Sequence, residues 1–266
     1  MTVVFGAIAP HGGMLVTEGE RHVAPATLAA MEELGRRFIA ARPEATIVFT
    51  PHNVHVEGAM AVIVAGALES EDPAPLHVPG ERDLALACLE TLHAEGVPVV
   101  GVSFGGNDAS EAVAPLDWGC SIPLWFMGGR AEPPLPIVVV TPARDLPPGE
   151  HVRAGRVLAE ATGARRVAVI ASADHGHAHD PAGPYGFDPA AEVYDALVTE
   201  LVRNDELAGL LRVSPQLVEA AKADSFWQML MLHGALRGGF EVEFLSYECP
   251  TYFGLLCAAY SLRDGR

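Results

Sequence analysis

The chain has 266 residues, half of them hydrophobic, and 34 acidic residues against 17 basic ones give it a formal net charge of −17. This length and apolar content are sufficient for one large α/β domain with a substantial core. A chain this acidic repels phosphate backbones and anionic lipid, so nucleic acid and membrane surfaces are excluded as expected partners.

Short β-branched runs alternate with longer helical patterns along the chain. In the first half we expect a strand over Val3–Ala9, a helix near 25–41, strands over Thr46–Thr50 and Ala59–Ala65, a helix over 81–95, and strands over Pro98–Val102 and Pro136–Thr141. In the second half we expect a helix near 149–162, a strand over Arg166–Ala171, helices near 189–203, 214–221 and 224–237, a strand over Glu241–Tyr247, and a final helix near 253–262.

This alternation predicts an α/β fold, a single domain over residues 1–266 with a largely parallel central sheet flanked by helices on both faces. The Pro-rich stretches near 72–79 and 131–136 are expected to be surface loops, because strand patterns resume on either side of them.

The cysteines and the N-terminal residues bear on the cellular compartment. Cys88, Cys120, Cys249 and Cys257 are widely spaced, without the pattern of a disulfide framework or a zinc motif. The first residues lack the basic region and long apolar run of a signal peptide. No apolar run approaches the roughly 20 residues that span a bilayer. We therefore expect a cytoplasmic protein.

Four polar clusters come directly after predicted strands, where ligand sites gather in open α/β sheets. They are Pro10-His11-Gly12-Gly13, Pro51-His52-Asn53, the segment from Ser172 to His179, and Tyr247-Glu248-Cys249-Pro250. If their strands are neighbours in the sheet, the four loops converge on one site.

His11 and His52 each follow an apolar run and a proline, which fixes the backbone and aims the next side chain reproducibly. Glu248 ends a strand pattern and supplies a carboxylate. Two imidazoles and one carboxylate that leave metal positions open are typical of non-haem Fe(II) oxygenases. The alternative is that both histidines are satisfied by backbone groups and that Glu248 is an exposed carboxylate.

A histidine-rich segment has the densest chemistry. His175, His177 and His179 alternate with small residues between Asp174 and Asp180, and an extended backbone would place the three imidazoles on one side. A general acid/base beside a metal, a second metal site and a solvated loop are the three interpretations.

Together, these positions resemble the class III (LigB-type) extradiol ring-cleaving dioxygenases, specifically the catalytic β-subunits such as those of protocatechuate 4,5-dioxygenase and 2-aminophenol dioxygenase. The matching residues are Pro10-His11, Pro51-His52, Ser172-Ala173-Asp174-His175-Gly176-His177, Gly183-Pro184-Tyr185-Gly186-Phe187-Asp188-Pro189 and Glu248, in the family's order over nearly the whole chain.

The resemblance implies that His11, His52 and Glu248 ligate Fe(II), which zinc or manganese could replace on isolation. It implies that His177 is the general acid/base in cleavage of a catechol- or aminophenol-type ring with O2. A homo-oligomer is expected, and some relatives add a small α-type subunit. Two positions depart from the family. Trp118 stands where a histidine near the substrate is usual, and His175 is a second titratable group at a position that is usually apolar, so both histidines remain candidates for the acid/base.

Two other functions compete with this one. In a distant branch of the same fold, the Memo-type proteins, a cysteine stands near the glutamate position, and Cys249 is adjacent to Glu248. On that interpretation the chain is a non-catalytic metal-binding protein. The other alternative is a zinc metallohydrolase that uses the loop with His175, His177 and His179, whose spacing resembles the His-x-His-x-Asp-His run of metallo-β-lactamase-like hydrolases.

Overall fold

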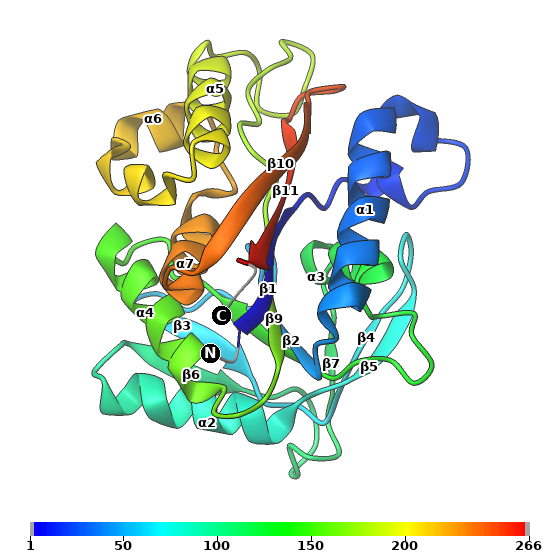
Figure 1. Ribbon diagram of the computed structural model, residues 1–266, viewed down its shortest axis with the longest axis vertical. Helices are drawn as coiled ribbons and strands as arrows, with labels where there is room; N and C mark the ends of the chain where they lie inside the picture. The colour runs from blue at the N-terminus through cyan, green and yellow to red at the C-terminus, as the bar shows by residue number, and fades with distance from the viewer. Residues whose placement is uncertain (1–2, 264–266) are drawn as a thin grey trace.

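An eight-stranded sheet runs through the computed structural model of the chain, which describes residues 3–263 (Figure 1). Its strands are β1 (Val3–Ala9), β2 (Ala45–Phe49), β3 (Met60–Ile63), β6 (Val99–Val102), β8 (Ile137–Thr141), β9 (Val167–Ser172), β10 (Phe240–Glu248) and β11 (Leu255–Leu262). They are arranged in the order β10-β11-β1-β9-β2-β8-β3-β6. The four central strands, β1, β9, β2 and β8, are parallel to one another. The predicted α/β fold with a largely parallel sheet is therefore confirmed, while residues 1–2 and 264–266 of the predicted domain lie outside the described residues.

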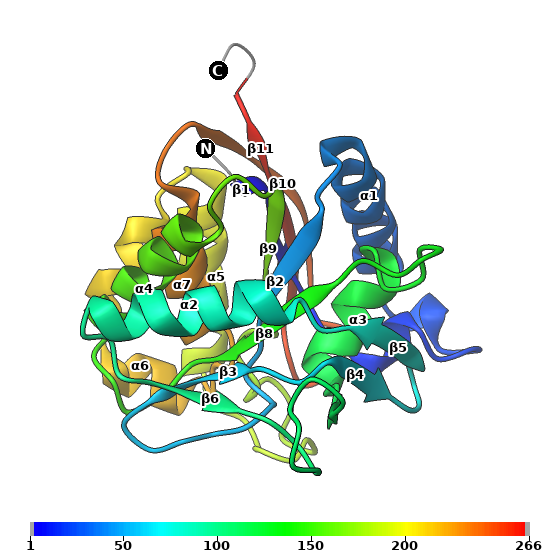
Figure 2. The same ribbon diagram turned by 90° about the horizontal axis from the view of Figure 1, so that it is seen from below.

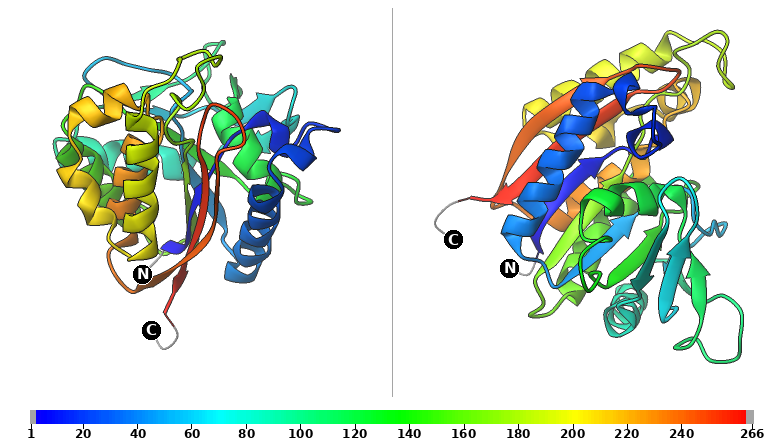
Figure 3. Two further views of the ribbon diagram at one scale, coloured as in Figure 1. Left: turned by 90° about the horizontal axis from the view of Figure 1, so that it is seen from above. Right: turned by 90° about the vertical axis from the view of Figure 1, so that its right-hand side faces the viewer.

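Helices cover both faces of the sheet (Figures 2 and 3). One face packs against α2 (Arg82–Ala94), α4 (Pro148–Ala161), α5 (Ala190–Arg203), α6 (Pro215–Ala220) and α7 (Phe226–Leu236). The other packs against α1 (Pro25–Ala41), α3 (Trp118–Phe126) and a small sheet of β4 (Ala67–Ser70), β5 (Leu76–Pro79) and β7 (Val113–Pro115). Short 3-10 helices lie at Gly13–Leu15, Arg21–Val23 and Leu207–Arg212. Within residues 3–263, no helix is long and apolar enough to cross a bilayer.

Alternation along the strands produces these two apolar layers. Ile47 of β2 belongs to the core on one face and its neighbour Val48 to the core on the other, as expected when successive side chains of a strand point to opposite faces. Because both faces are buried, the central strands are almost continuously apolar.

The same property explains a wrong prediction at the C-terminal end of the chain. The helix expected near 253–262 is a strand, β11, which lies between β1 and β10. Its first six residues are buried, so its sequence is a continuous apolar run that does not alternate, and periodicity cannot separate such a run from a buried helix. The Pro-rich stretch near 72–79 was also not wholly a loop, because β5 occupies Leu76–Pro79.

The parallel centre of the sheet brings three of the polar clusters together. β9 lies between β1 and β2 and is parallel to both. The loops that begin with Pro10-His11, Pro51-His52 and Ser172-Ala173 therefore leave the sheet at one edge. The fold thus places two Pro-His pairs on either side of the histidine-rich segment.

Candidate metal centre

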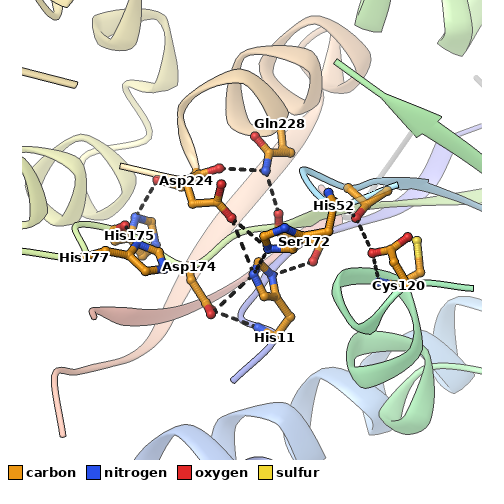
Figure 4. Close-up of polar contacts among 12 residues, drawn as sticks. His11, His52, Cys120, Ser172, Asp174, His175, His177, Asp224 and Gln228 are labelled. Atoms are coloured by element: carbon orange, nitrogen blue, oxygen red, sulfur yellow. Dashed lines mark hydrogen bonds and ion pairs between the residues drawn. The ribbon is translucent and has the colours of Figure 1, made fainter. Parts of the chain in front are cut away.

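His11, His52 and Asp224 form a cluster at this edge of the sheet (Figure 4). The Nε2 atoms of the two histidines are 3.0 Å apart. Oδ2 of Asp224 lies 3.5 Å from Nε2 of His11 and 3.2 Å from Nε2 of His52. His11 and Asp224 are buried and His52 is half-buried. Three potential ligand atoms thus form a nearly equilateral triangle with one side toward solvent.

The three residues fit a divalent metal ion. Two donors about 2.1 Å from one ion and at right angles to each other are about 3 Å apart, which is the spacing of this triangle. Oδ2 of Asp224 is buried and has no hydrogen-bond partner within residues 3–263, an arrangement that is costly unless a cation faces it. Burial by itself raises the pKa of Asp224, but His11 and His52 outweigh burial and hold that pKa well below its ordinary value. The carboxylate is therefore ionised and available as a ligand.

His11 is held in place by the loop after β9. Its Nδ1 lies 2.9 Å from Oγ of Ser172, and its backbone N–H donates to Oδ1 of Asp174 over 2.9 Å. A histidine that binds a metal through Nε2 carries its proton on Nδ1, and a fixed acceptor there sets the tautomer and the ring orientation. Ser172 and Asp174 therefore prepare Nε2 of His11 for a metal.

Asp224 precedes α7 and is held from two sides. The Arg144 guanidinium lies 2.5 Å from Oδ1 of Asp224 and packs over the ring of Trp227. Nε2 of the buried Gln228 donates to the backbone oxygens of Asp224 and Ser172, which ties the start of α7 to the end of β9. Oδ1 is thereby engaged, and Oδ2 is left facing the two imidazoles.

His52 is positioned by Trp118, one of the two residues that depart from the family pattern. The Trp118 ring stacks on His52 at a centroid distance of 4.4 Å and an interplanar angle of 28°. Below it, Asp117 accepts hydrogen bonds from Thr50 and Asn53 and caps the N-terminus of α3. In this chain Trp118 therefore supports a residue of the cluster.

Glu248, the predicted third ligand, lies elsewhere. Its Oε2 accepts hydrogen bonds from the backbone N–H of Thr27 at 2.6 Å and from the Thr27 hydroxyl at 2.7 Å. Both bonds join the end of β10 to the first turn of α1. The structure thus brings together two of the three predicted ligands and supplies Asp224 as the third member of the cluster.

The three histidines of the 172–179 segment point to different partners. His175 is buried, and its Nδ1 lies 2.9 Å from Oγ of Ser225. Burial lowers the pKa of His175 and keeps it neutral at neutral pH. His179 lies 2.9 Å from Oδ2 of Asp195. His177 is half-buried, and its Nδ1 lies 2.7 Å from the backbone oxygen of His175. The expected one-sided row of imidazoles is not formed.

Cys249, which the Memo-type alternative requires near the metal, has a different environment. Its thiol donates to the backbone oxygen of Thr251, and burial, with the nearby Asp195 carboxylate, raises its pKa to about 11. The thiol is therefore neutral at pH 7 and is not a member of the His11–His52–Asp224 group.

A cavity of about 970 Å³ lies against the cluster. His52, Asp224 and His177 all line it, as do two cationic side chains, Arg144 and Lys222. Much of the remaining wall is apolar and comes from Leu146, Pro147, Pro148, Val213, Pro215, Val218, Phe226 and Trp227. The open side of the cluster thus faces a space large enough for an organic ligand.

Asp224 and Arg144 were missed by the sequence reasoning. Asp224 stands with Ser225 at the start of the expected helix near 224–237, where Asp and Ser are common capping residues, so nothing local distinguishes a metal ligand there. Arg144 follows the strand expected over Pro136–Thr141. That strand lies beside β2 in the sheet, and only this neighbourhood would have indicated that Arg144 lies near His52.

Comparison with a family model, with curated proteins and with solved structures shows what this chain is similar to. The profile of the family described as "Catalytic LigB subunit of aromatic ring-opening dioxygenase" matches residues 6–257. The Clostridium acetobutylicum protein CA_C1420 is 25% identical over 252 residues, which are 90% of this chain and 53% of that protein, so the chain spans about half the length of this relative. The crystal structure of the uncharacterized protein JW3007 from Escherichia coli K12 matches with a TM-score of 0.64 and 18% identity, over 96% of this chain and 99% of that one. At this identity it supports the fold alone.

Proposed function

Because this chain belongs to the family of catalytic LigB subunits of aromatic ring-opening dioxygenases, we propose that it is a non-haem Fe(II)-dependent extradiol dioxygenase acting on a catechol- or aminophenol-type ring. The observation that carries the proposal is the triangle of His11, His52 and Asp224, whose open side faces a cavity that His177 also lines. Two imidazoles and one carboxylate are the ligand set of this class of oxygenases.

His11, His52 and Asp224 would hold the iron. When bound, Fe(II) would supply the site at which the two adjacent ring heteroatoms and O2 meet, and both oxygen atoms enter the product, so no external reductant is consumed. The protein leaves one side of the ligand triangle open and orients the ring in the cavity. Phe226 and Trp227 belong to the apolar part of the cavity wall, against which the ring would pack.

His177 is the proposed general acid/base. A backbone oxygen can only accept, so its Nδ1, 2.7 Å from the His175 oxygen, carries the proton. Nε2 is then the nitrogen that can take a proton from the substrate hydroxyl and return it later. The rings of Phe253 and Tyr252 pack against the imidazole and fix its plane. His175 is buried, bonded to Ser225 and absent from the cavity wall, which favours His177 for this role.

The test is anaerobic reconstitution with Fe(II), followed by oxygen uptake and visible absorbance with a panel of catechols and aminophenols. We expect about one iron per chain and a yellow ring-fission product. His177→Gln should keep the iron and lower turnover by about 10²- to 10⁴-fold, the usual contribution of a general acid/base. Iron binding without oxygen uptake across the panel would contradict the reaction, and loss of iron in His177→Gln would contradict the assigned roles.

The proposal extends to the resident metal, the compartment and the assembly. Fe(II) is the proposed working metal, and zinc or manganese would occupy the site after aerobic isolation. The cytoplasm is the proposed location, because the four cysteines are free. A homo-oligomer, with or without a small α-type subunit, is the proposed assembly, and the mass of the purified protein in solution tests it.

A further inference from the structure

Three aromatic rings pack around His177, and one of them lies at the cavity. Phe253 is buried and Tyr252 is half-buried. Tyr185 is 56% exposed, and its ring centroid lies 5.7 Å from that of the imidazole at an interplanar angle of 86°. Within residues 3–263, Tyr185 is the one of these three that lines the cavity. Its ring is therefore next to both the proposed general acid/base and the space for a ligand.

Tyr185 is held by a loop, residues 180–188, whose two ends are joined. At the base of the loop, the backbone N–H of Asp188 donates to the backbone oxygen of Ala178 over 2.9 Å. Two successive turns inside the loop are closed by backbone hydrogen bonds of 2.9 and 3.2 Å. The loop thus has a defined shape that orders Tyr185 before a ligand binds, so binding requires little further loss of conformational freedom.

The loop lies directly on Tyr252. A Cβ atom at Gly183 would be 2.7 Å from Cβ of Tyr252, which is too close for any side chain, so only glycine permits this contact. The ring centroids of Tyr185 and Tyr252 lie 6.3 Å apart, within the range of aromatic pairs. Tyr252 in turn packs against His177. The contact therefore fixes the position of Tyr185 relative to the proposed acid/base.

Phe187, two residues after Tyr185, provides an internal comparison. It is also aromatic, belongs to the same loop and is 59% exposed. Within the described part of the chain, however, it makes no ring contact with His177 and does not line the cavity. Exposed apolar side chains are common on protein surfaces, so exposure alone does not indicate a function. Tyr185 differs from Phe187 in its place at the cavity wall beside His177.

A ring bound at the metal would lie within reach of Tyr185. His52 and Asp224 of the cluster line the same cavity as His177 and Tyr185. In the proposed reaction a hydroxyl of the ring is bonded to Nε2 of His177. A ring in that place is next to the imidazole, and Tyr185 is the imidazole's aromatic neighbour in the cavity wall.

We propose that Tyr185 is the specificity-determining residue that packs against the ring of the substrate and so favours aromatic over ring-free metal chelators. The inference rests on the proposed function, because it assumes that the ring lies at the metal with a hydroxyl at His177. Two aromatic rings attract each other in offset-stacked or edge-to-face geometries, beyond the effect of buried area. A bound ring also removes the exposed part of Tyr185 from water. Both effects act on ligand binding and not on proton transfer.

The binding experiment uses the whole chain loaded anaerobically with Zn(II), so that ligands bind without turnover. The ligands are catechol and acetohydroxamate, which both chelate a metal through two oxygen atoms, but only catechol has a ring. Tyr185→Ala should weaken catechol binding about tenfold, and Tyr185→Phe, which keeps the ring, should stay within about twofold of the wild-type protein. Acetohydroxamate should bind all variants alike, which also shows that they are folded and carry the metal. Calorimetric titration gives the Kd values.

Phe187→Ala is the matched control, because it removes an equally exposed ring from the same loop. It should leave the Kd values of both chelators unchanged. An unchanged catechol Kd in Tyr185→Ala, an equal loss of affinity for both chelators, or the same loss in Phe187→Ala would overturn the inference.

Turnover of the Fe(II)-loaded protein gives a second readout. Tyr185→Ala should raise KM for catechol about tenfold and change kcat by less than about threefold, because it removes binding that the substrate and the transition state share. His177→Gln should instead lower kcat. A fall in kcat in Tyr185→Ala as large as that in His177→Gln, with KM unchanged, would show that Tyr185 acts in the chemistry and not in recognition, contrary to the inference.

Failure of the proposed function has a different signature. In that case the wild-type protein loaded with Fe(II) consumes no oxygen with catechol, or catechol does not compete with acetohydroxamate for the Zn(II)-loaded protein, and the inference about Tyr185 falls as well. If oxygen uptake and competition are both observed and Tyr185→Ala leaves the catechol Kd unchanged, the proposed function stands and the inference about Tyr185 alone fails.

Discussion

Two buried aspartates, Asp195 and Asp224, each lie beside histidines, but their oxygen atoms are used differently. Oδ1 of Asp195 accepts from the backbone N–H of Gly176 at 2.7 Å, and Oδ2 lies 2.7 Å from the Tyr247 hydroxyl and 2.9 Å from Nε2 of His179. Oδ2 of Asp224 has no hydrogen-bond donor within residues 3–263 and faces two imidazole nitrogens and the cavity.

The difference shows what separates a structural network from a candidate metal site in this fold. A carboxylate whose oxygens all accept hydrogen bonds is already stable when buried. A carboxylate with a free oxygen toward two nitrogen lone pairs is stable only if a proton or a metal ion lies between them. By this criterion Asp195 fixes the histidine-rich segment, and Asp224 belongs with His11 and His52.

Removing the Asp224 charge should have the largest effect. Asp224→Asn leaves two neutral imidazoles, which hold Fe(II) weakly, so bound iron should fall from about one per chain to less than about one tenth, and oxygen uptake should fall with it. Iron analysis after gel filtration measures this. Circular dichroism serves as the control for folding, and a folded Asp224→Asn protein with full iron would remove Asp224 from the ligand set.

Loss of the acceptor behind His11 should have a smaller effect on the same site. Ser172→Ala removes the hydroxyl 2.9 Å from Nδ1 of His11, and such partners typically contribute about 10- to 100-fold to metal affinity. A competition titration with a chelator gives the affinity. Ser246→Ala, a buried serine on β10, is the matched control, and equal weakening in both variants would argue against an orienting role for Ser172.

The sequence predicted His11 and His52 for a shared site because each histidine lies in a short loop after a parallel strand, and neighbouring parallel strands end at one edge. Their partner was not predictable in the same way. Asp224 lies just before α7, far from both histidines in the sequence. It reaches the site only because that helix packs against β9. Glu248 seemed suitable because it ends a strand. However, β10 is an edge strand that pairs with β11, and the Glu248 side chain points toward α1.

The fold class was predictable from strand–helix alternation, whereas β11 was not, because a strand buried on both faces loses its alternation.

Asp195→Asn should act on stability instead of on the metal. The new amide group would face N–H and O–H donors, and leaving one buried donor without an acceptor costs about 1–3 kcal/mol. For a chain of this length the midpoint of thermal unfolding should fall by about 3–10 °C. Iron content should stay near one per chain. Loss of iron without loss of stability would mean that Asp195 supports metal binding, as Asp224 does, and does not mainly stabilise the histidine-rich segment.

Glu248→Gln should have the smallest effect and decides between two ligand sets. A glutamine can still accept from the N–H and hydroxyl of Thr27 through Oε1, so only the charge assistance of those two bonds is lost, about 0.5–1 kcal/mol. Iron content and the chelator titration should match the wild-type chain, because the structure joins this carboxylate to α1 and leaves the cluster intact. If the variant instead lost iron as completely as Asp224→Asn, the end of β10 would have to rearrange on metal binding to bring Glu248 to the two histidines. The pair of substitutions therefore tests the ligand set with one amide exchange at each of the two competing carboxylates.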